Sequence, residues 1–140
     1  MSRLMAIDFG TRRVGIAVTD PLQIIASPVK TIAPENLSGF IKEYTASEVV
    51  EQIVLGYPLR EDGTPTDLTA AVDKLLDKLK IDFPAISFCK HDERYTSKLA
   101  QKSMVQSGAR KKSRREKSNL DQISATLILQ SFMEKKKWTQ

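Results

Sequence analysis

The chain has 140 residues and a net charge of +5, with 41% hydrophobic and 28% charged residues. This composition is typical of a globular protein, and the length predicts a single domain over residues 1–140. No apolar run approaches the roughly 20 residues that span a bilayer, and the N-terminus lacks the pattern of a cleaved signal peptide. The one cysteine, Cys89, excludes an internal disulfide. We therefore expect a cytoplasmic protein with no membrane partner.

The N-terminal part of the chain predicts three antiparallel strands. Residues 4–8 and 14–18 are short apolar runs, and the short link between them contains Gly10, a spacing that favours a hairpin. A third strand is expected within residues 24–32. Pro28 interrupts this strand and indicates a sheet edge or a bulge, because proline cannot donate a hydrogen bond to a neighbouring strand.

Helical and strand patterns alternate along the rest of the chain. A helix capped by Asn36, a buried strand at 52–55, a helix from about Thr66, a strand at 85–89 and a helix from Thr96 to about Gly108 are predicted in turn. The last helix is expected to begin at Ser118 or Asn119, with Leu120, Ile123, Leu127 and Ile128 facing inward. This order predicts an α/β fold, in which an antiparallel meander is followed by parallel pairings in one mixed sheet flanked by helices.

Positive charge is concentrated near the C-terminus. A basic loop is predicted at about 109–118, and it contains Arg110, Lys111, Lys112, Arg114, Arg115 and Lys117. Three more lysines lie within a segment at 135–140 that is expected to be a frayed tail. Such clusters attract polyanions, nucleic acids above all, although a loop of this kind can also be merely solvated.

Three acidic residues far apart in the sequence are candidates for a shared site. Asp8 closes the first strand, Glu93 follows the last strand, and Asp121 lies in the first turn of the last helix. Active sites of open sheets collect at the carboxyl ends of parallel strands, so these carboxylates are expected to converge there. Converging carboxylates repel one another unless a cation lies between them, and hard oxygen ligands favour Mg²⁺ or Mn²⁺. Ions of this kind can promote hydrolysis of phosphodiester bonds.

Each acid also has a purely structural explanation. Ser118 and Asp121 fit a capping-box pattern, and Glu93 could simply favour the N-terminus of the following helix. Asp8 could accept hydrogen bonds from backbone amides of the tight turn that follows it. His91 is interpreted as a structural residue.

Five motifs in the same order resemble the YqgF family, Holliday-junction-resolvase-like proteins regarded as nucleases of pre-16S rRNA. They are Ala6–Ala17 (AIDFGTRRVGIA), Ser27-Pro28, Gly56-Tyr57-Pro58-Leu59 with Asp62-Gly63, Asp92–Ser97 (DERYTS) and Leu120–Ala125 (LDQISA). Each motif is weak alone, but together they cover nearly the whole chain.

The resemblance implies a ribonuclease-H-like fold and an acidic catalytic set made of Asp8, Glu93 and Asp121. It also implies that the basic loop contacts nucleic acid. We expect a metal-dependent endonuclease that takes part in processing pre-16S rRNA, with Mg²⁺ or Mn²⁺ as the cofactor. Arg12, Arg13 and Arg94 are candidates for contacts with the substrate phosphates.

Three alternative functions remain open from the sequence. The chain could resolve Holliday junctions in branched DNA, or it could be a non-catalytic RNA-binding factor in ribosome assembly. Asp8-Phe9-Gly10-Thr11 also looks like the first phosphate loop of the actin and sugar-kinase superfamily, but those phosphotransferases bind nucleotide between two such domains and 140 residues supply only one. The expected partner is structured RNA or branched DNA, bound by a monomer or a weak homodimer.

Overall fold

The structure is a computed structural model that describes residues 1–94 and 117–138. The predicted helix from Thr96 to Gly108 and residues 109–116 of the predicted basic loop lie outside the described residues. None of the helices in the described part of the chain is long and apolar enough to cross a membrane.

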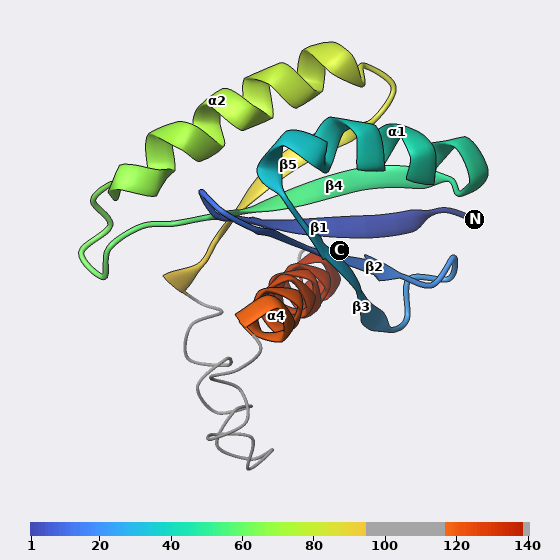
Figure 1. Cartoon of the computed structure of the whole chain (residues 1–140). Coiled ribbons are helices and arrows are strands. Elements are labelled where there is room, and N and C mark those ends of the chain that lie inside the picture. Colours follow the sequence, from blue (N-terminus) through green and yellow to red (C-terminus); the bar gives the residue numbers. More distant parts are fainter. Residues whose placement is uncertain (95–116, 139–140) are drawn as a thin grey trace.

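A five-stranded mixed sheet with the order β3-β2-β1-β4-β5 forms the centre of the molecule (Figure 1). Its strands are β1 (Arg3–Phe9), β2 (Val14–Thr19), β3 (Ala26–Ile32), β4 (Val50–Tyr57) and β5 (Ser87–Asp92). The first three strands pair antiparallel, whereas β4 pairs parallel with both β1 and β5. The predicted fold class is therefore confirmed, and the carboxyl ends of β1, β4 and β5 lie at one edge.

The antiparallel meander has the local features that its sequence predicts. In the β1–β2 hairpin, the backbone N–H of Gly10 donates to the carbonyl of Arg13 at 2.9 Å. β3 is an edge strand, and its pairing with β2 shifts register between Ile16 and Ala17, next to the pair of Ala17 with Pro28. The proline thus lies both at a sheet edge and at an irregularity.

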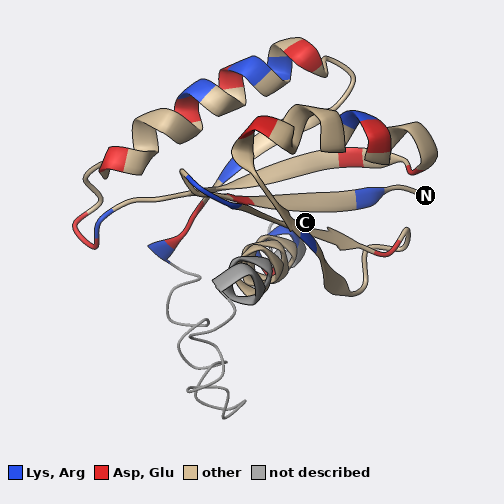
Figure 2. Ribbon diagram, in the orientation of Figure 1, with Lys and Arg blue, Asp and Glu red and all other residues tan. Residues whose placement is uncertain are grey.

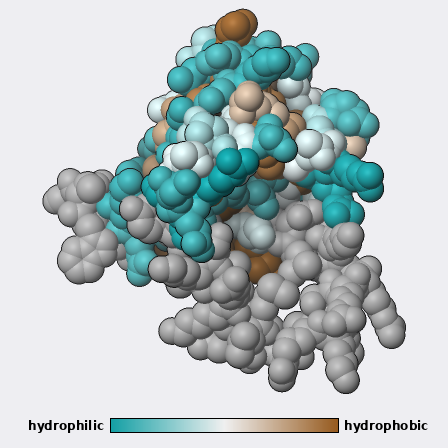
Figure 3. All heavy atoms as spheres, turned by 90° about the vertical axis from the view of Figure 1, so that its left-hand side faces the viewer, coloured by the Kyte–Doolittle hydropathy of each residue, from teal (hydrophilic) through white to brown (hydrophobic). Residues whose placement is uncertain are grey.

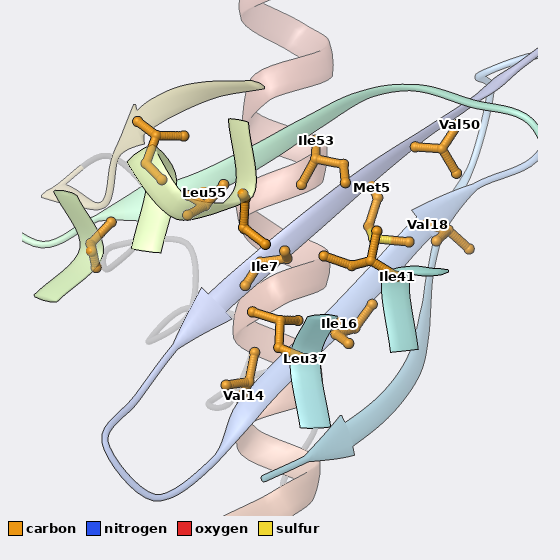
Figure 4. Close-up of a cluster of buried hydrophobic side chains, with 13 residues drawn as sticks. Met5, Ile7, Val14, Ile16, Val18, Leu37, Ile41, Val50, Ile53 and Leu55 are labelled. Carbon is orange, nitrogen blue, oxygen red and sulfur yellow. The ribbon is translucent and has the colours of Figure 1, made fainter. Parts of the chain in front are cut away.

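Helices cover both faces of the sheet (Figure 1). α1 (Leu37–Ser47), preceded by the short 3₁₀ helix η1 (Pro34–Asn36), and α2 (Asp67–Asp82) lie over one face, and α4 (Lys117–Trp138) lies over the other. Met5 and Ile7 of β1 pack in the core on the side of α1 and α2 (Figure 4), whereas Leu4 and Ala6 pack with residues of α4. Side chains of β1 therefore alternate between two hydrophobic layers, as a strand buried on both faces requires.

One cap and one element boundary differ in detail from those predicted. Asn36 is the N-cap residue of α1, as expected, but its side chain makes no capping hydrogen bond, whereas Thr66 caps α2 in a capping box with Thr69. The last strand begins at Ser87 and continues through Asp92, instead of spanning residues 85–89. As a result, Glu93 directly follows the strand, and His91 belongs to it.

The last helix also differs in detail from its prediction. It begins at Lys117, so Asp121 is its fifth residue and lies beyond the first turn, which contains no acidic residue. Ile123 is 40% exposed and does not face inward, whereas Ala125, Ile128 and Leu129 are buried against the sheet. Residues 135–138 continue the helix where a frayed tail was expected, since lysines near a helix C-terminus are favourable to its dipole.

We expect Ile128→Ala to lower the free energy of unfolding by about 2–5 kcal/mol, because it leaves a cavity in the layer between α4 and the sheet. Ile123→Ala, the same substitution on the exposed face of the same helix, should cost about 1 kcal/mol or less. Urea unfolding followed by circular dichroism measures both values. Equal losses in the two variants would contradict the placement of α4.

Candidate active site

Asp8 and Glu93 come together at the carboxyl ends of β1 and β5. In β1, Asp8 lies two residues beyond Ala6, and alternation along the strand places it on the face that α4 covers. Glu93 follows β5 directly, and its backbone N–H donates to the carbonyl of Tyr57 at 3.1 Å. Since β4 lies between β1 and β5, the two acids approach each other across the end of β4.

The two carboxyl groups are joined by a hydrogen bond, so one of them must carry a proton. Burial, the negative charge of Asp8 and this hydrogen bond together raise the pKa of Glu93 to about 8, with a smaller contribution from Asp92. At neutral pH and without a cation, the Asp8–Glu93 pair therefore holds a proton that two separate surface carboxylates would have lost.

Gly56 leaves space for the carboxyl group of Glu93 and for Ile128 of α4. A Cβ atom at this position would lie 2.8 Å from Oε1 of Glu93 and 2.6 Å from Cδ1 of Ile128 in α4. Real Cβ atoms essentially never approach so closely, so a side chain at position 56 would require the ends of the Glu93 and Ile128 side chains to shift. The absence of a side chain in β4 thus permits both the close approach of α4 and the position of Glu93.

His91 is part of the support of this site. It is buried on the α4 side, where its Nε2 lies 2.8 Å from Oγ of Ser131 and its ring meets Phe132 edge-on. Burial and the nearby charge of Lys135 lower the pKa of His91. A neutral, fully packed imidazole agrees with the structural interpretation of this residue.

The structure places Asp121 in α4, two turns before Ile128, the residue that packs against Gly56. The side chain of Asp121 is not among those described, so its distance from the Asp8–Glu93 pair is not defined. Among the described side chains, no group of three or more histidines, cysteines or acids forms a metal-binding cluster. The described part of the site is therefore a pair of acids.

The predicted phosphate-binding arginines have different surroundings. Arg12 and Arg13 are exposed at the tip of the β1–β2 hairpin, which follows Asp8. Arg94 instead donates from Nε and Nη2 to Oδ2 of Asp92, at 2.8 and 2.6 Å, and it lowers the pKa of that carboxyl. Of the basic loop, Lys117 is the first residue of α4; Arg110, Lys111, Lys112, Arg114 and Arg115 lie outside the described residues.

Basic and acidic residues both lie near Asp8 and Glu93. Figure 2 shows blue segments at the tip of the β1–β2 hairpin, in the loop between β4 and α2 and at the end of β5, with red segments beside them in that loop and at the end of β5. Figure 3 looks onto this end of the molecule, where much of the described surface is hydrophilic.

Two features of the site were missed from the sequence. Gly56 was interpreted only as the end of a strand, although glycine inside a strand often marks a close approach of another group. The pairing of Asp92 with Arg94 was also missed, although residues two apart at the end of a strand share a face. Both signals are visible in the sequence once the strand boundaries are known.

The donor set fits a hard divalent cation such as Mg²⁺ or Mn²⁺. Two carboxyl groups that share a proton offer oxygen ligands to a cation, which can replace that proton and relieve their repulsion. One cysteine and one histidine in the whole chain do not supply the ligands of a structural zinc site.

We expect the carboxyl of Glu93 to titrate near pH 8 in metal-free protein, and Asp8→Asn to lower this pKa because it removes the neighbouring negative charge. Between pH 4.5, the ordinary pKa of a glutamate, and about pH 8, Glu93 is protonated in the folded state and ionised in the unfolded state. The free energy of unfolding therefore falls as pH rises through this window. Carboxyl ¹³C NMR and urea unfolding at several pH values, compared between wild type and Asp8→Asn, measure both effects. Asp77→Asn on the exposed side of α2 is the control, and an unchanged Glu93 titration in Asp8→Asn would contradict the coupling.

Comparison with known proteins identifies the family of this chain. The family model of RuvX, described as "Holliday junction resolvase", matches residues 2–135. A relative from Amoebophilus asiaticus is 50% identical over 133 residues, which cover 95% of this chain and 94% of the relative. A relative from Flavobacterium psychrophilum is 43% identical over 136 residues, covering 97% and 99% of the two chains. Both relatives carry the name "Putative pre-16S rRNA nuclease".

One solved structure, described as a "putative sugar kinase" from Cytophaga hutchinsonii, matches 71% of this chain and 39% of its own with a TM-score of 0.45 and 14% identity. A likeness at this level indicates neither a shared activity nor a shared substrate. The family match instead confirms the resemblance drawn from the five sequence motifs, and the mixed sheet with three helices is ribonuclease-H-like. The chain belongs to the RuvX family.

Proposed function

We propose that this protein is a divalent-metal-dependent endonuclease that hydrolyses phosphodiester bonds of pre-16S rRNA during ribosome biogenesis. The hydrogen-bonded Asp8–Glu93 pair at the carboxyl edge of the sheet is the observation that carries this proposal. The names of the relatives support the substrate. We also propose that the protein acts in the cytoplasm, where its half-buried Cys89 would stay reduced.

We assign the cation to Asp8 and Glu93, with Asp121 as the third ligand from α4. A bound Mg²⁺ or Mn²⁺ would make a water molecule more acidic and stabilise negative charge on the leaving oxygen. Asp8 and Glu93 would hold the cation in place of their shared proton, and Gly56 leaves room for the Glu93 carboxyl group. Because both acids sit at the ends of strands, their positions are set by the sheet and not by a flexible loop.

We assign binding of the phosphate backbone of the substrate to the arginines of the β1–β2 hairpin and to the basic segment that precedes α4 in the sequence. Arg12 and Arg13 lie on the hairpin that starts immediately after Asp8, so phosphates bound there would be close to the acids. Charge contacts of this kind carry no base specificity, and selection of the cleavage site would come from the shape of the RNA. The description of the family favours branched DNA as a second candidate substrate.

Asp8→Asn and Glu93→Gln should each reduce cleavage of a pre-16S rRNA transcript by at least about 100-fold in Mg²⁺, because each variant removes a proposed cation ligand. Asp77→Asn, a matched loss of one carboxylate at an exposed position of α2, should cleave as wild type does. A four-way DNA junction, tested in parallel at equal salt, decides between the two substrates.

Calorimetry with Mn²⁺ separates the enzyme from a non-catalytic RNA-binding factor. We expect wild type to bind Mn²⁺ and Asp8→Asn to bind it at least about tenfold more weakly, whereas both bind RNA alike in the absence of metal. If wild type binds RNA but no Mn²⁺, and Asp8→Asn cleaves as well as wild type, the assignment of a metal-dependent nuclease is wrong.

A further inference from the structure

The side chain of Arg94 is folded back onto the strand that ends beside it. Its Nε and Nη2 donate to Oδ2 of Asp92 at 2.8 and 2.6 Å, and its backbone N–H donates to Oδ1 of Asp92 at 2.9 Å. Both oxygens of one carboxylate are therefore bound by one residue. Glu93 lies between the two partners, so its backbone is held within a closed loop of hydrogen bonds.

The same guanidinium also contacts the loop that joins β4 to α2. Nη1 of Arg94 donates to the carbonyl of Glu61 at 3.4 Å, and it lies 3.4 Å from the position that a Cβ of Gly63 would occupy. Gly63 has a φ of +88° and closes the turn by donating to the carbonyl of Arg60 at 2.8 Å. Arg94 thus connects the end of β5 to this turn, and a side chain at position 63 would be strained as well as crowded.

A second set of contacts holds Glu93 from the side of β4. Its backbone N–H donates to the carbonyl of Tyr57, and the Tyr57 hydroxyl donates to Asp73 of α2 at 3.0 Å. Lys90 forms an ion pair with Asp73 at 3.3 Å, and its ammonium lies 4.3 Å above the Tyr57 ring. The backbone of Glu93 is therefore fixed both by its neighbour in the sheet and by the residues that flank it in sequence.

We propose that Arg94 is a positioning residue, which fixes the Glu93 carboxylate beside Asp8, and that it does not bind the substrate phosphate. This inference rests on the proposed function, because it explains how one of the proposed cation ligands is oriented. Arg94 is suited to this role because a planar guanidinium can bind a carboxylate through two donors and a carbonyl through a third. A phosphate bound to Arg94 would have to compete with Asp92 for the same donors.

Arg94→Lys tests the inference, because lysine keeps the positive charge but cannot reproduce the planar set of donors. We expect kcat for RNA cleavage and the affinity for Mn²⁺ each to fall about 10–100-fold, the range found when groups that orient metal ligands are replaced. The KM and the salt dependence of RNA binding should stay as in wild type, since no phosphate contact is lost.

Arg3→Lys is the matched control. Arg3 is also bound to a carboxylate and a carbonyl, those of Glu48 and Thr19, but it lies at the opposite end of β1. This variant should keep the wild-type kcat and Mn²⁺ affinity. Thermal unfolding of all variants identifies any general loss of stability.

Asp92→Asn is the second variant, and it keeps the experiment decisive if Arg94→Lys does not fold. It removes the charged acceptor and leaves Arg94 in place. If Arg94 positions Glu93, kcat and Mn²⁺ affinity should fall as in Arg94→Lys. If Arg94 binds phosphate, the arginine released from Asp92 should instead bind RNA more tightly, with kcat preserved.

The outcomes distinguish this inference from the proposed function. A higher KM and a shallower salt dependence in Arg94→Lys, with wild-type kcat and Mn²⁺ affinity, would show a phosphate contact and overturn the inference alone. Wild-type behaviour of Arg94→Lys in every assay would overturn it as well. A wild-type protein that neither binds Mn²⁺ nor cleaves RNA would overturn the proposed function and, with it, the inference.

Discussion

The contact between the carboxyl groups of Asp8 and Glu93 is the constraint on which this end of the molecule depends. Two acids that share a proton in a partly buried place are unfavourable for folding, because both desolvation and mutual repulsion oppose their ionised forms. The surrounding structure nevertheless forces them together: β4 lacks a side chain at Gly56, and Ile128 of α4 packs into the space that is left. A fold selected for stability alone would separate such acids, so their contact indicates a function that needs them side by side.

Hydrophobic packing determines on which face the acids lie. Leu4 and Ala6 pack toward α4 and Met5 and Ile7 pack toward α1 and α2, so a shift of β1 by one residue would exchange the two layers and move Asp8 to the other face. In β5 the hydrogen bond between His91 and Ser131 also fixes the register, since it keeps the side chain of His91 on the face of the sheet that α4 covers. The position of the catalytic candidates is thus a consequence of two cores that both fix the register.

The sequence predicted those parts of the structure that depend on local pattern. The meander, the parallel pairings and the meeting of Asp8 with Glu93 followed from strand spacing and from the rule that strand ends gather at one edge. The last strand was misplaced because its polar members Lys90 and His91 are stabilised by Asp73 and Ser131, which are distant in sequence. The close approach of Ile128 to Gly56 and the exposure of Ile123 both depend on how α4 packs on the sheet. The periodicity of the sequence does not contain this information.

The shared proton also determines how a cation would enter the site. Because the pKa of Glu93 is raised to about 8, a cation that binds at neutral pH must displace a proton, and its apparent affinity increases with pH up to that value. A cation that bound only the folded arrangement of the two acids would also stabilise the folded protein. In the proposed enzyme, the raised pKa of Glu93 would thus couple cation binding to the protonation and the stability of the folded protein. Tyr57 accepts the backbone N–H of Glu93 and Arg94 binds Asp92 beside it, so the backbone from which the Glu93 carboxyl extends is held at the edge of the sheet.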